Sequence, residues 1–176
     1  MKGMFTVGIL TVSDRGWTCE RQDRSGGVIR EMLSNIGFRI ASYDVVPDEE
    51  GLIAEKLIKW ADEGKLDIIL TTGGTGLSPR DVTPEATLSV LDKLVPGFVE
   101  VIRAETFKKT PMAVLSRAVA GTRGECLIIN LPGSPRAVRE CLEVIVPALS
   151  HAVETLKGQA GECGIPEDHN PWHNMP

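Results

Sequence analysis

The sequence predicts an α/β fold of three layers, in which helices cover both faces of a mostly parallel central sheet. Short segments rich in Ile, Val and Leu alternate with segments whose apolar residues recur at helical spacing, the pattern of a parallel sheet covered by helices. Each predicted strand ends in a polar or glycine-rich turn. The length of 176 residues favours a single domain, and the apolar content of 42% is typical of a soluble globular chain.

The first half of the chain contains two predicted strand–helix units. Residues 4–12 (MFTVGILTV) are almost wholly apolar and β-prone, which predicts a central strand. A polar loop at 16–24 follows, with Trp17 and Cys19 expected to be exposed. Ser25 is a good cap for a helix that Gly37 closes. Residues 38–46 alternate between apolar and polar, which predicts a less buried strand, and a helix is expected over 50–63.

The second half begins with a buried strand at Ile68, Ile69 and Leu70. Thr83 is expected to cap a helix with Pro84 at its first position, and helices are predicted over 86–91, 97–106 and 112–120. Residues 126–131 (CLIINL) form the last predicted parallel strand. A helix from Arg136 to about Leu156 follows, kinked at Pro147.

The predicted domain spans residues 1–158, and residues 159–176 are expected to form an extended tail because they contain few apolar residues. Cys163, His169 and His173 in this tail could suggest a metal, but structural zinc normally has four well-spaced ligands.

Composition and charge exclude several functional classes. The net charge of −5 argues against a general nucleic-acid surface, because that kind of binding neutralises phosphates with Lys and Arg. The four cysteines form no CxxC pair, and no apolar stretch is long enough for a membrane span. The N-terminal apolar run is too short for a signal peptide, so we expect a reduced, cytoplasmic protein with no membrane partner.

The segment DIILTTGGTGLSPRDVTPEAT, residues 67–87, is organised as strand, glycine loop and helix. In that arrangement backbone N–H groups can approach a phosphate closely, because glycine has no Cβ. The segment lacks the lysine of GxxxxGK[ST], and Pro79 stands where GxGxxG requires glycine. It adds a carboxylate, Asp81, whose alternative role is simply to cap a turn.

Four chemically equipped turns should meet at one edge of the sheet, because ligands of parallel sheets bind beyond the carboxyl ends of the strands. Two of these turns contain glycine loops, at 73–76 and 132–134, which suggests one elongated or two adjoining anionic ligands. Asp48 and Asp81 lie beside them, and carboxylates next to phosphates usually indicate Mg²⁺. The residues themselves therefore predict a Mg²⁺-assisted phosphate-ester or nucleotide site.

The block TTGGTGLSPRDVTPEAT resembles the MogA/MoaB family of molybdenum cofactor biosynthesis and the related gephyrin G domains. SDR after the first strand, VPDE after the second and INLPGSP after the last extend this resemblance. It implies a molybdopterin adenylyltransferase, a nucleotidyltransferase in which the terminal phosphate of molybdopterin attacks the α-phosphate of MgATP and pyrophosphate leaves. It also implies a homotrimer and possible handover of adenylyl-molybdopterin to a molybdate-inserting MoeA-type protein.

The resemblance also implies the site residues. Asp48 and Asp81 match the family's catalytic aspartates, which we expect to position Mg²⁺ and the reacting phosphates. The implied substrate- and nucleotide-binding residues are Ser13, Asp14, Arg15, Gly73, Gly74, Thr75, Gly76, Ser78, Arg80, Thr83, Ser116, Arg117, Asn130, Pro132, Gly133 and Ser134. For Arg117, an ordinary surface position in a helix is an equally good interpretation.

The loop after SDR departs from the family pattern, because Cys19 stands where many members have glycine. Trp17 in the same loop could stack on a pterin or adenine, or could pack on the protein's own surface. Two other functions remain open: a non-catalytic, MoaB-type pterin-binding or scaffolding trimer, and a nucleotide-pyrophosphate hydrolase. The survival of both aspartates and both glycine loops favours the transferase.

Overall fold

The six strands form one sheet in the order β2-β1-β3-β6-β5-β4 in the computed structural model, which describes residues 4–20 and 22–159. Strands β1 (Thr6–Val12), β2 (Arg39–Val46), β3 (Ile68–Thr72) and β6 (Cys126–Leu131) are parallel to their neighbours in this group. Strands β5 (Ala120–Arg123) and β4 (Lys93–Leu94) continue the sheet in antiparallel pairing. The predicted mostly parallel sheet is therefore confirmed.

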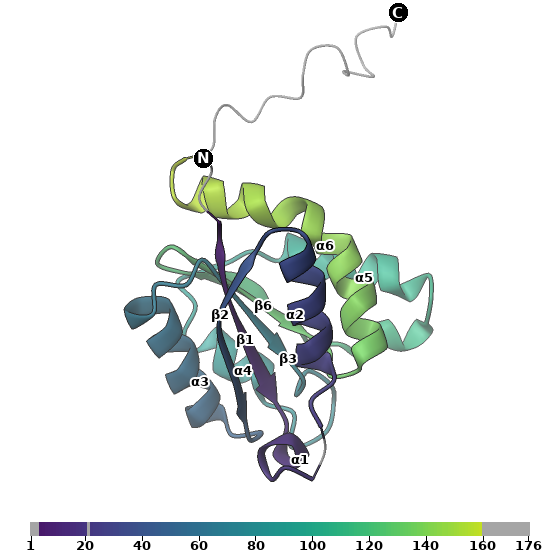
Figure 1. Cartoon of the computed structure of the whole chain (residues 1–176). Helices are drawn as coiled ribbons and strands as arrows, with labels where there is room; N and C mark the ends of the chain where they lie inside the picture. Colours follow the sequence, from purple (N-terminus) through teal and green to yellow (C-terminus); the bar gives the residue numbers. More distant parts are fainter. Residues whose placement is uncertain (1–3, 21, 160–176) are drawn as a thin grey trace, which may run out of the picture.

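Helices cover both faces of the sheet, as expected (Figure 1). On one face lie α2 (Ser25–Asn35), α5 (Gly97–Phe107) and α6 (Pro135–Leu156), and on the other lie α3 (Glu50–Ile58) and α4 (Thr83–Leu88). The π-helical segment η1 (Lys59–Glu63) prolongs α3, so the predicted helix over 50–63 is present, with a wider last turn. Figure 1 also shows α6 bending along its length, and this helix contains Pro147.

The core consists of two apolar layers, one on each face of the sheet. Side chains of successive strand residues point to opposite faces, so Ile68 and Leu70 join the layer under α2 and α6, whereas Ile69 joins the layer under α3. Strand β3 is buried along its whole length, whereas β2 at the edge alternates between exposed and half-buried residues. Strand β1 is also buried beyond its first residue, so the lesser burial predicted for β2 relative to β1 is confirmed.

Four local expectations were wrong. Residues 112–120 do not form a helix: η2 (Pro111–Leu115) is a short 3₁₀ turn, and the chain then extends into β5. The helix expected over 86–91 is α4, which ends at Leu88 and is followed by β4. Thr83 and Ser25 are the first residues of their helices and do not cap them.

No helix within residues 4–20 and 22–159 is long and apolar enough to cross a membrane. The tail expected at 159–176 lies almost entirely outside the described residues, and so do Cys163, His169 and His173.

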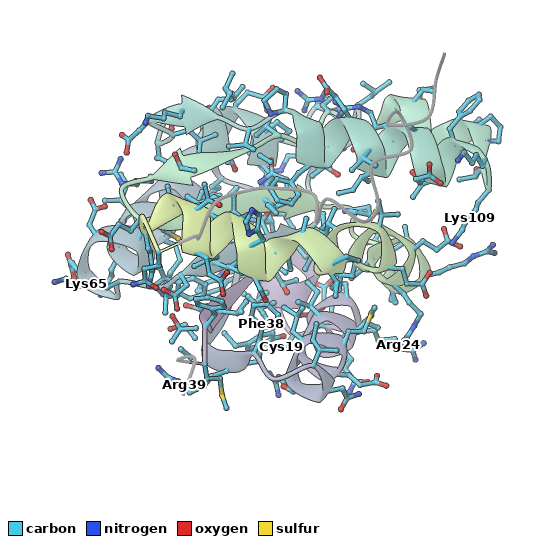
Figure 2. The ribbon with its side chains drawn as sticks, turned by 90° about the horizontal axis from the view of Figure 1, so that it is seen from above. Cys19, Arg24, Phe38, Arg39, Lys65 and Lys109 are labelled. Carbon is cyan, nitrogen blue, oxygen red and sulfur yellow. The ribbon has the colours of Figure 1, made fainter. Side chains whose placement is uncertain are left out.

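In the view from above, Lys65 in the turn before β3 and Lys109 after α5 lie on opposite sides of the molecule (Figure 2).

Candidate active site

The turns that follow the four parallel strands enclose a cavity of about 400 Å³. Ser13 follows β1, Asp48 follows β2, Gly73 and Gly74 follow β3, and Gly133 follows β6. The short helix α1 (Asp14–Trp17) lies just beyond the ends of β1 and β2 (Figure 1). The convergence expected from strand topology is present in the structure.

A second cavity of about 460 Å³ adjoins the first. Gly74, Asp81, Gly133 and Ser134 line both cavities and so form the boundary between them. The outer walls of the second cavity come from α5, η2 and α6. This arrangement suits two adjoining ligands, or one ligand that passes over the two glycine loops.

The glycine loop after β3 depends on glycine at two positions. Gly73 and Gly74 have φ angles of +103° and +64°, a region that L side chains rarely adopt. A Cβ on Gly73 would collide with the carbonyl oxygen of Val12, and a Cβ on Gly133 would lie 3.3 Å from Gly73 Cα. The loops after β3 and β6 are therefore in direct contact; there is no room for a larger residue at Gly73, and one at Gly133 would be tightly packed.

Thr83 anchors the glycine loop to the start of α4. Its Oγ1 donates to the carbonyl oxygen of Gly73 at 2.9 Å, and its backbone N–H donates to the carbonyl oxygen of Gly74 at 3.1 Å. Thr83 is fully buried. Its hydroxyl is engaged by the protein, so the residue supports the loop.

Asp48 lies half-buried at the wall of the first cavity. Its Oδ2 accepts a hydrogen bond from the backbone N–H of Asp14 at 2.9 Å, and its own N–H donates to Asp14 Oδ1 at 3.0 Å. Burial raises the pKa of the Asp48 carboxyl above its ordinary value, and the negative charges of Asp14 and Asp81 act in the same direction.

Asp14 is also paired with Arg80, which donates to it from Nε and from a terminal guanidinium nitrogen, at 3.1 and 2.8 Å. The hydrogen bond from Arg80 is the main cause that lowers the pKa of Asp14. This exposed, two-pronged pair joins α1 to the end of the glycine loop. Neither Arg80 nor the exposed Arg15 lines the cavities.

Asp81 faces both cavities, and its Oδ2 accepts a hydrogen bond from the backbone N–H of Ser78 at 3.0 Å. A Cβ on Gly76 would lie 2.9 Å from Asp81 Oδ2, and one on Gly74 would lie 3.0 Å from Asp48 Oδ1. The glycines thus leave room for both carboxylates beside the loop. Ser78 is an exposed turn residue whose backbone orients Asp81.

Two carboxylates at one cavity fit Mg²⁺, which proteins usually hold with one or two carboxylates, the remaining positions being filled by phosphate oxygens and water. Within the described part of the chain, no group of three or more His, Cys, Asp or Glu side chains could hold a metal by itself. The donor set of Asp48 and Asp81 therefore suits a metal that arrives with a phosphate ligand.

Asn130 lines the second cavity and Arg117 lies beside it, but both are bonded to the protein itself. Arg117 donates to the carbonyl oxygens of Gly76 and Asp81, both at 2.7 Å, and forms an ion pair with Glu85. Asn130 is 1% exposed, donates to Thr71 and Thr87, and accepts from the N–H of Val119. Both residues support the loops around the cavities.

Ser116, Thr75 and Pro132 line the second cavity. Thr75 is buried, and the carbonyl oxygen of Pro132 accepts a hydrogen bond from Thr72 Oγ1 at 2.7 Å. Ser134 caps α6, its side chain accepting from the N–H of Ala137 at 3.5 Å. The expected site residues at these positions therefore lie at the cavities.

Asp23 is a cavity residue that was not among the expected site residues. It accepts hydrogen bonds from Thr11 Oγ1 and Tyr43 Oη, both at 2.5 Å, and from Ser25 Oγ and Gly26 N–H at 2.9 and 3.0 Å. Although burial opposes ionisation, these donors hold the pKa of Asp23 below its ordinary value. The spacing of Asp23 to the start of α2 is a capping pattern that could have identified it.

Arg103 and Glu140 also line the second cavity and were not expected there. No local pattern marks them, because they come from the middle of α5 and α6 and meet one cavity only through packing of these helices.

The chain is similar to proteins of molybdopterin metabolism. A family model described as "Probable molybdopterin binding domain" matches residues 8–151. A molybdopterin adenylyltransferase of Helicobacter pylori (strain J99) is 46% identical over 154 residues, which cover 86% of this chain and 88% of that protein. The Escherichia coli K12 protein of the same name is 38% identical over 150 residues, covering 84% and 76%.

The same similarity extends to solved structures. The structure of the molybdopterin biosynthesis enzyme MoaB of Thermus thermophilus aligns with a TM-score of 0.84 and 55% sequence identity. The alignment covers 88% of this chain and 98% of that one.

Proposed function

The chain belongs to the family of molybdopterin binding domains, and from that membership we propose that it is a molybdopterin adenylyltransferase of molybdenum cofactor biosynthesis. In the proposed reaction, an oxygen of the terminal phosphate of molybdopterin forms a bond to the α-phosphorus of ATP. The bond between that phosphorus and the β-phosphate oxygen breaks, and pyrophosphate leaves with the electron pair. The product is adenylyl-molybdopterin.

The observation that carries this proposal is the meeting of Asp48, Asp81 and two helix N-termini at one cavity. Ser25 begins α2 and Pro135 begins α6, and both line the first cavity. Helix N-termini favour anions, because their free N–H groups and the helix dipole point toward them. The positive ends of two helices and two carboxylates together suit a metal-bound polyphosphate better than either pair would alone.

Asp48 and Asp81 would hold Mg²⁺ in this site. When bound, Mg²⁺ neutralises charge on the phosphates and stabilises the charge that develops on the leaving pyrophosphate. The backbone of Gly73 and Gly74 would approach the phosphates closely, because neither residue has a Cβ. The Asp14–Asp48 and Ser78–Asp81 hydrogen bonds would fix the orientation of the two carboxylates before substrate arrives.

The decisive experiment combines the protein with Mg²⁺, ATP and molybdopterin, and measures formation of adenylyl-molybdopterin and pyrophosphate. Asp81→Asn should lower the rate at least about 100-fold with the fold retained, because the loss of a preorganised charge is usually this costly. Asp62→Asn is the matched control, since Asp62 is paired with Arg123 and lines neither cavity. Unchanged turnover in Asp81→Asn would remove Asp81 from the mechanism.

Two outcomes would point to other functions. Tight pterin binding without consumption of ATP would indicate a non-catalytic, MoaB-type pterin-binding protein. Release of AMP from ADP-ribose in the absence of a pterin would indicate a nucleotide-pyrophosphate hydrolase.

The proposal extends to assembly and location. We propose a homotrimer that hands its product to a molybdate-inserting MoeA-type protein in the cytoplasm, where ATP is available. Val101, Phe107 and Val114 expose large apolar side chains on α5 and η2, which supports self-association. Sedimentation at working concentration tests this, and a monomer mass would contradict it.

A further inference from the structure

The second cavity contains a guanidinium group with unused donors. Arg103 reaches the cavity from α5 and is half-buried. One terminal nitrogen donates to the carbonyl oxygens of Ser116 and Ala118, at 3.4 and 3.2 Å. No carboxylate among residues 4–20 and 22–159 forms an ion pair with Arg103, and its remaining N–H groups bond to none of these residues. These donors are available to a ligand.

The same cavity contains a carboxylate with an unused oxygen. Glu140 reaches it from α6, and its side chain is only 16% exposed. Its Oε1 accepts a hydrogen bond from Arg136 Nε at 3.0 Å, whereas its Oε2 has no hydrogen-bond donor within the described part of the chain. No fully buried side-chain nitrogen or oxygen in that part lacks a partner, so this oxygen is not fully buried, and Glu140 lines the cavity.

Arg103 and Glu140 do not pair with each other, although opposite charges that share one cavity attract. Much of the cavity wall is apolar and includes Ile102, Leu115 and Pro132. The cavity therefore offers donors from α5, an acceptor oxygen from α6 and apolar surface along its walls. A flat heterocycle with an acceptor beside a pair of donors would complement it.

The 2-amino-4-oxopyrimidine edge of a pterin has this pattern. Its ring N–H and its amino group are adjacent donors, of which the unused Oε2 of Glu140 can accept one and the second lone pair of Oε1 the other. Its 4-oxo oxygen is an acceptor for a guanidinium. The adenine edge has one amino group beside acceptor ring nitrogens and offers no adjacent pair of donors to a carboxylate. The donor and acceptor order of the cavity therefore favours the pterin over adenine.

We infer that Glu140 and Arg103 are specificity-determining residues that bind the 2-amino-4-oxopyrimidine edge of the pterin in the second cavity. The inference rests on the proposed function for the identity of the substrate. A pterin held here extends its phosphate-bearing side chain across the boundary residues Gly74 and Asp81 toward the first cavity. Adenylate then occupies the first cavity or its rim.

The test compares two ligands that differ at one position: 6-hydroxymethylpterin and its lumazine counterpart, in which oxygen replaces the 2-amino group. Binding is followed through the fluorescence of the ligands, and AMP binding is measured separately by calorimetry. Wild-type protein should prefer the pterin. Glu140→Gln should weaken pterin binding about 10- to 100-fold, the usual cost of losing a charge-assisted hydrogen bond, and should narrow or reverse the preference.

Arg103→Met should weaken both ligands about 10-fold or more, because both keep the 4-oxo group. Arg103→Lys retains the charge and can still donate to Ser116 and Ala118, but it lacks the guanidinium fork. Weaker ligand binding by this variant is therefore due to loss of the fork and not to loss of the fold. The controls are Glu143→Gln and Arg139→Gln, which alter exposed charges on α6 outside the cavity and should stay within twofold of wild type.

Three results would overturn the inference: pterin binding within twofold of wild type in Glu140→Gln, equal losses for pterin and lumazine in that variant, or a loss of AMP binding instead. Absence of pterin binding by the wild type would overturn it as well. These results are distinct from failure of the proposed function. A protein that binds pterin through Glu140 but does not transfer adenylate refutes only the transferase.

Discussion

Asp14 and Asp48 bind each other reciprocally through their backbones: each carboxylate accepts a hydrogen bond from the other residue's N–H, at 2.9 and 3.0 Å. The turns after β1 and β2 are thereby locked together at the edge of the first cavity. The two negative charges are also brought close, which is one reason why the pKa of Asp48 is raised, after burial.

This relationship predicts the acid side of the pH–rate profile. Asp48 must be ionised to hold Mg²⁺, so kcat/KM should rise with pH as Asp48 loses its proton, with an apparent pKa above the ordinary value of 3.8. Asp14→Asn keeps the backbone N–H that donates to Asp48 but removes the repelling charge and frees Arg80. The rise should therefore move to lower pH in this variant. A rise at the same or higher pH in Asp14→Asn would contradict the prediction.

The contribution of Asp48 to stability depends on pH in the opposite direction to its contribution to kcat/KM. Because the folded protein binds the Asp48 proton more tightly than the unfolded chain does, the contribution of Asp48 to the free energy of unfolding falls as pH rises from 3.8 through the raised pKa. The carboxylate is thus retained for function at a cost in stability.

Arg117 should act as a positioning residue. It bridges the carbonyl oxygens of Gly76 and Asp81, which are the two ends of the turn that presents Asp81 to the cavities. Arg117→Met should lower kcat about 10- to 100-fold, because a displacement of about 1 Å in a reacting group can cost this much. Steady-state kinetics and a thermal denaturation midpoint should be measured on the same preparation.

Arg123→Met is the matched control. Arg123 also joins a carboxylate, Asp62, and a carbonyl oxygen, that of Val90, but it does so far from the cavities. Both variants should lose stability, and only Arg117→Met should lose kcat. Equal losses of kcat in both would reduce Arg117 to an ordinary structural arginine.

The sequence predicted the parts of the site that are continuous in the chain. The strand that ends at Thr72 and the two glycine loops were evident, because apolar β-prone residues lead directly into residues without side chains. Strand β5 was missed, since its four residues AGTR carry no β-pattern of their own and only the pairing with β6 decides their conformation. Gly124, with φ +53°, marks the turn between these strands and was the available signal.

The second cavity could not be predicted, for a different reason. Its walls bring together α5, η2 and α6, and the chemistry of Arg103 and Glu140 depends on which partners they lack. The position of a residue in a helix reveals neither which other elements share its cavity nor which partners its side chain lacks. Arg117 illustrates the converse, because its place near the site was expected but its bonds to Gly76 and Asp81 make it a support for the loop.

Cys19→Gly should stabilise the protein. Cys19 has φ +59°, in the left-handed region that costs a residue with a Cβ about 1–2 kcal/mol, and its side chain is exposed. Glycine removes this strain but increases the freedom of the unfolded chain by about 0.4–1 kcal/mol, so the net gain should be about 0.5–1 kcal/mol. Urea denaturation measures it. Cys19→Ala keeps the Cβ and should give no gain; an equal gain in both variants would assign the effect to loss of the thiol.

Asp67 should stabilise the end of the sheet opposite the cavities. Its side chain is 8% exposed and joins three segments: it accepts from Thr6 N–H and Thr6 Oγ1 at 2.6 and 2.9 Å, and it pairs with Lys157 at the end of α6. Burial alone would raise the pKa of Asp67, but Lys157 and Thr6 together hold it below 3.8. The ion pair therefore stabilises the fold above pH 3.8, and this contribution is lost as pH falls through the lowered pKa.

Asp67→Asn keeps an acceptor for Thr6 but leaves Lys157 without its partner. The free energy of unfolding at pH 7 should fall by about 2–3 kcal/mol, somewhat less than for a fully buried pair because Lys157 is 24% exposed. Glu105→Gln, which breaks the exposed pair with Lys108, should cost less than about 1 kcal/mol. Urea denaturation at neutral pH and at a pH below the lowered pKa of Asp67 distinguishes charge from packing. If charge is the cause, the difference between wild type and Asp67→Asn shrinks in acid, because Asp67 then becomes protonated and resembles the amide; a difference that persists undiminished would show that shape and hydrogen bonding, not the ion pair, hold these three segments together.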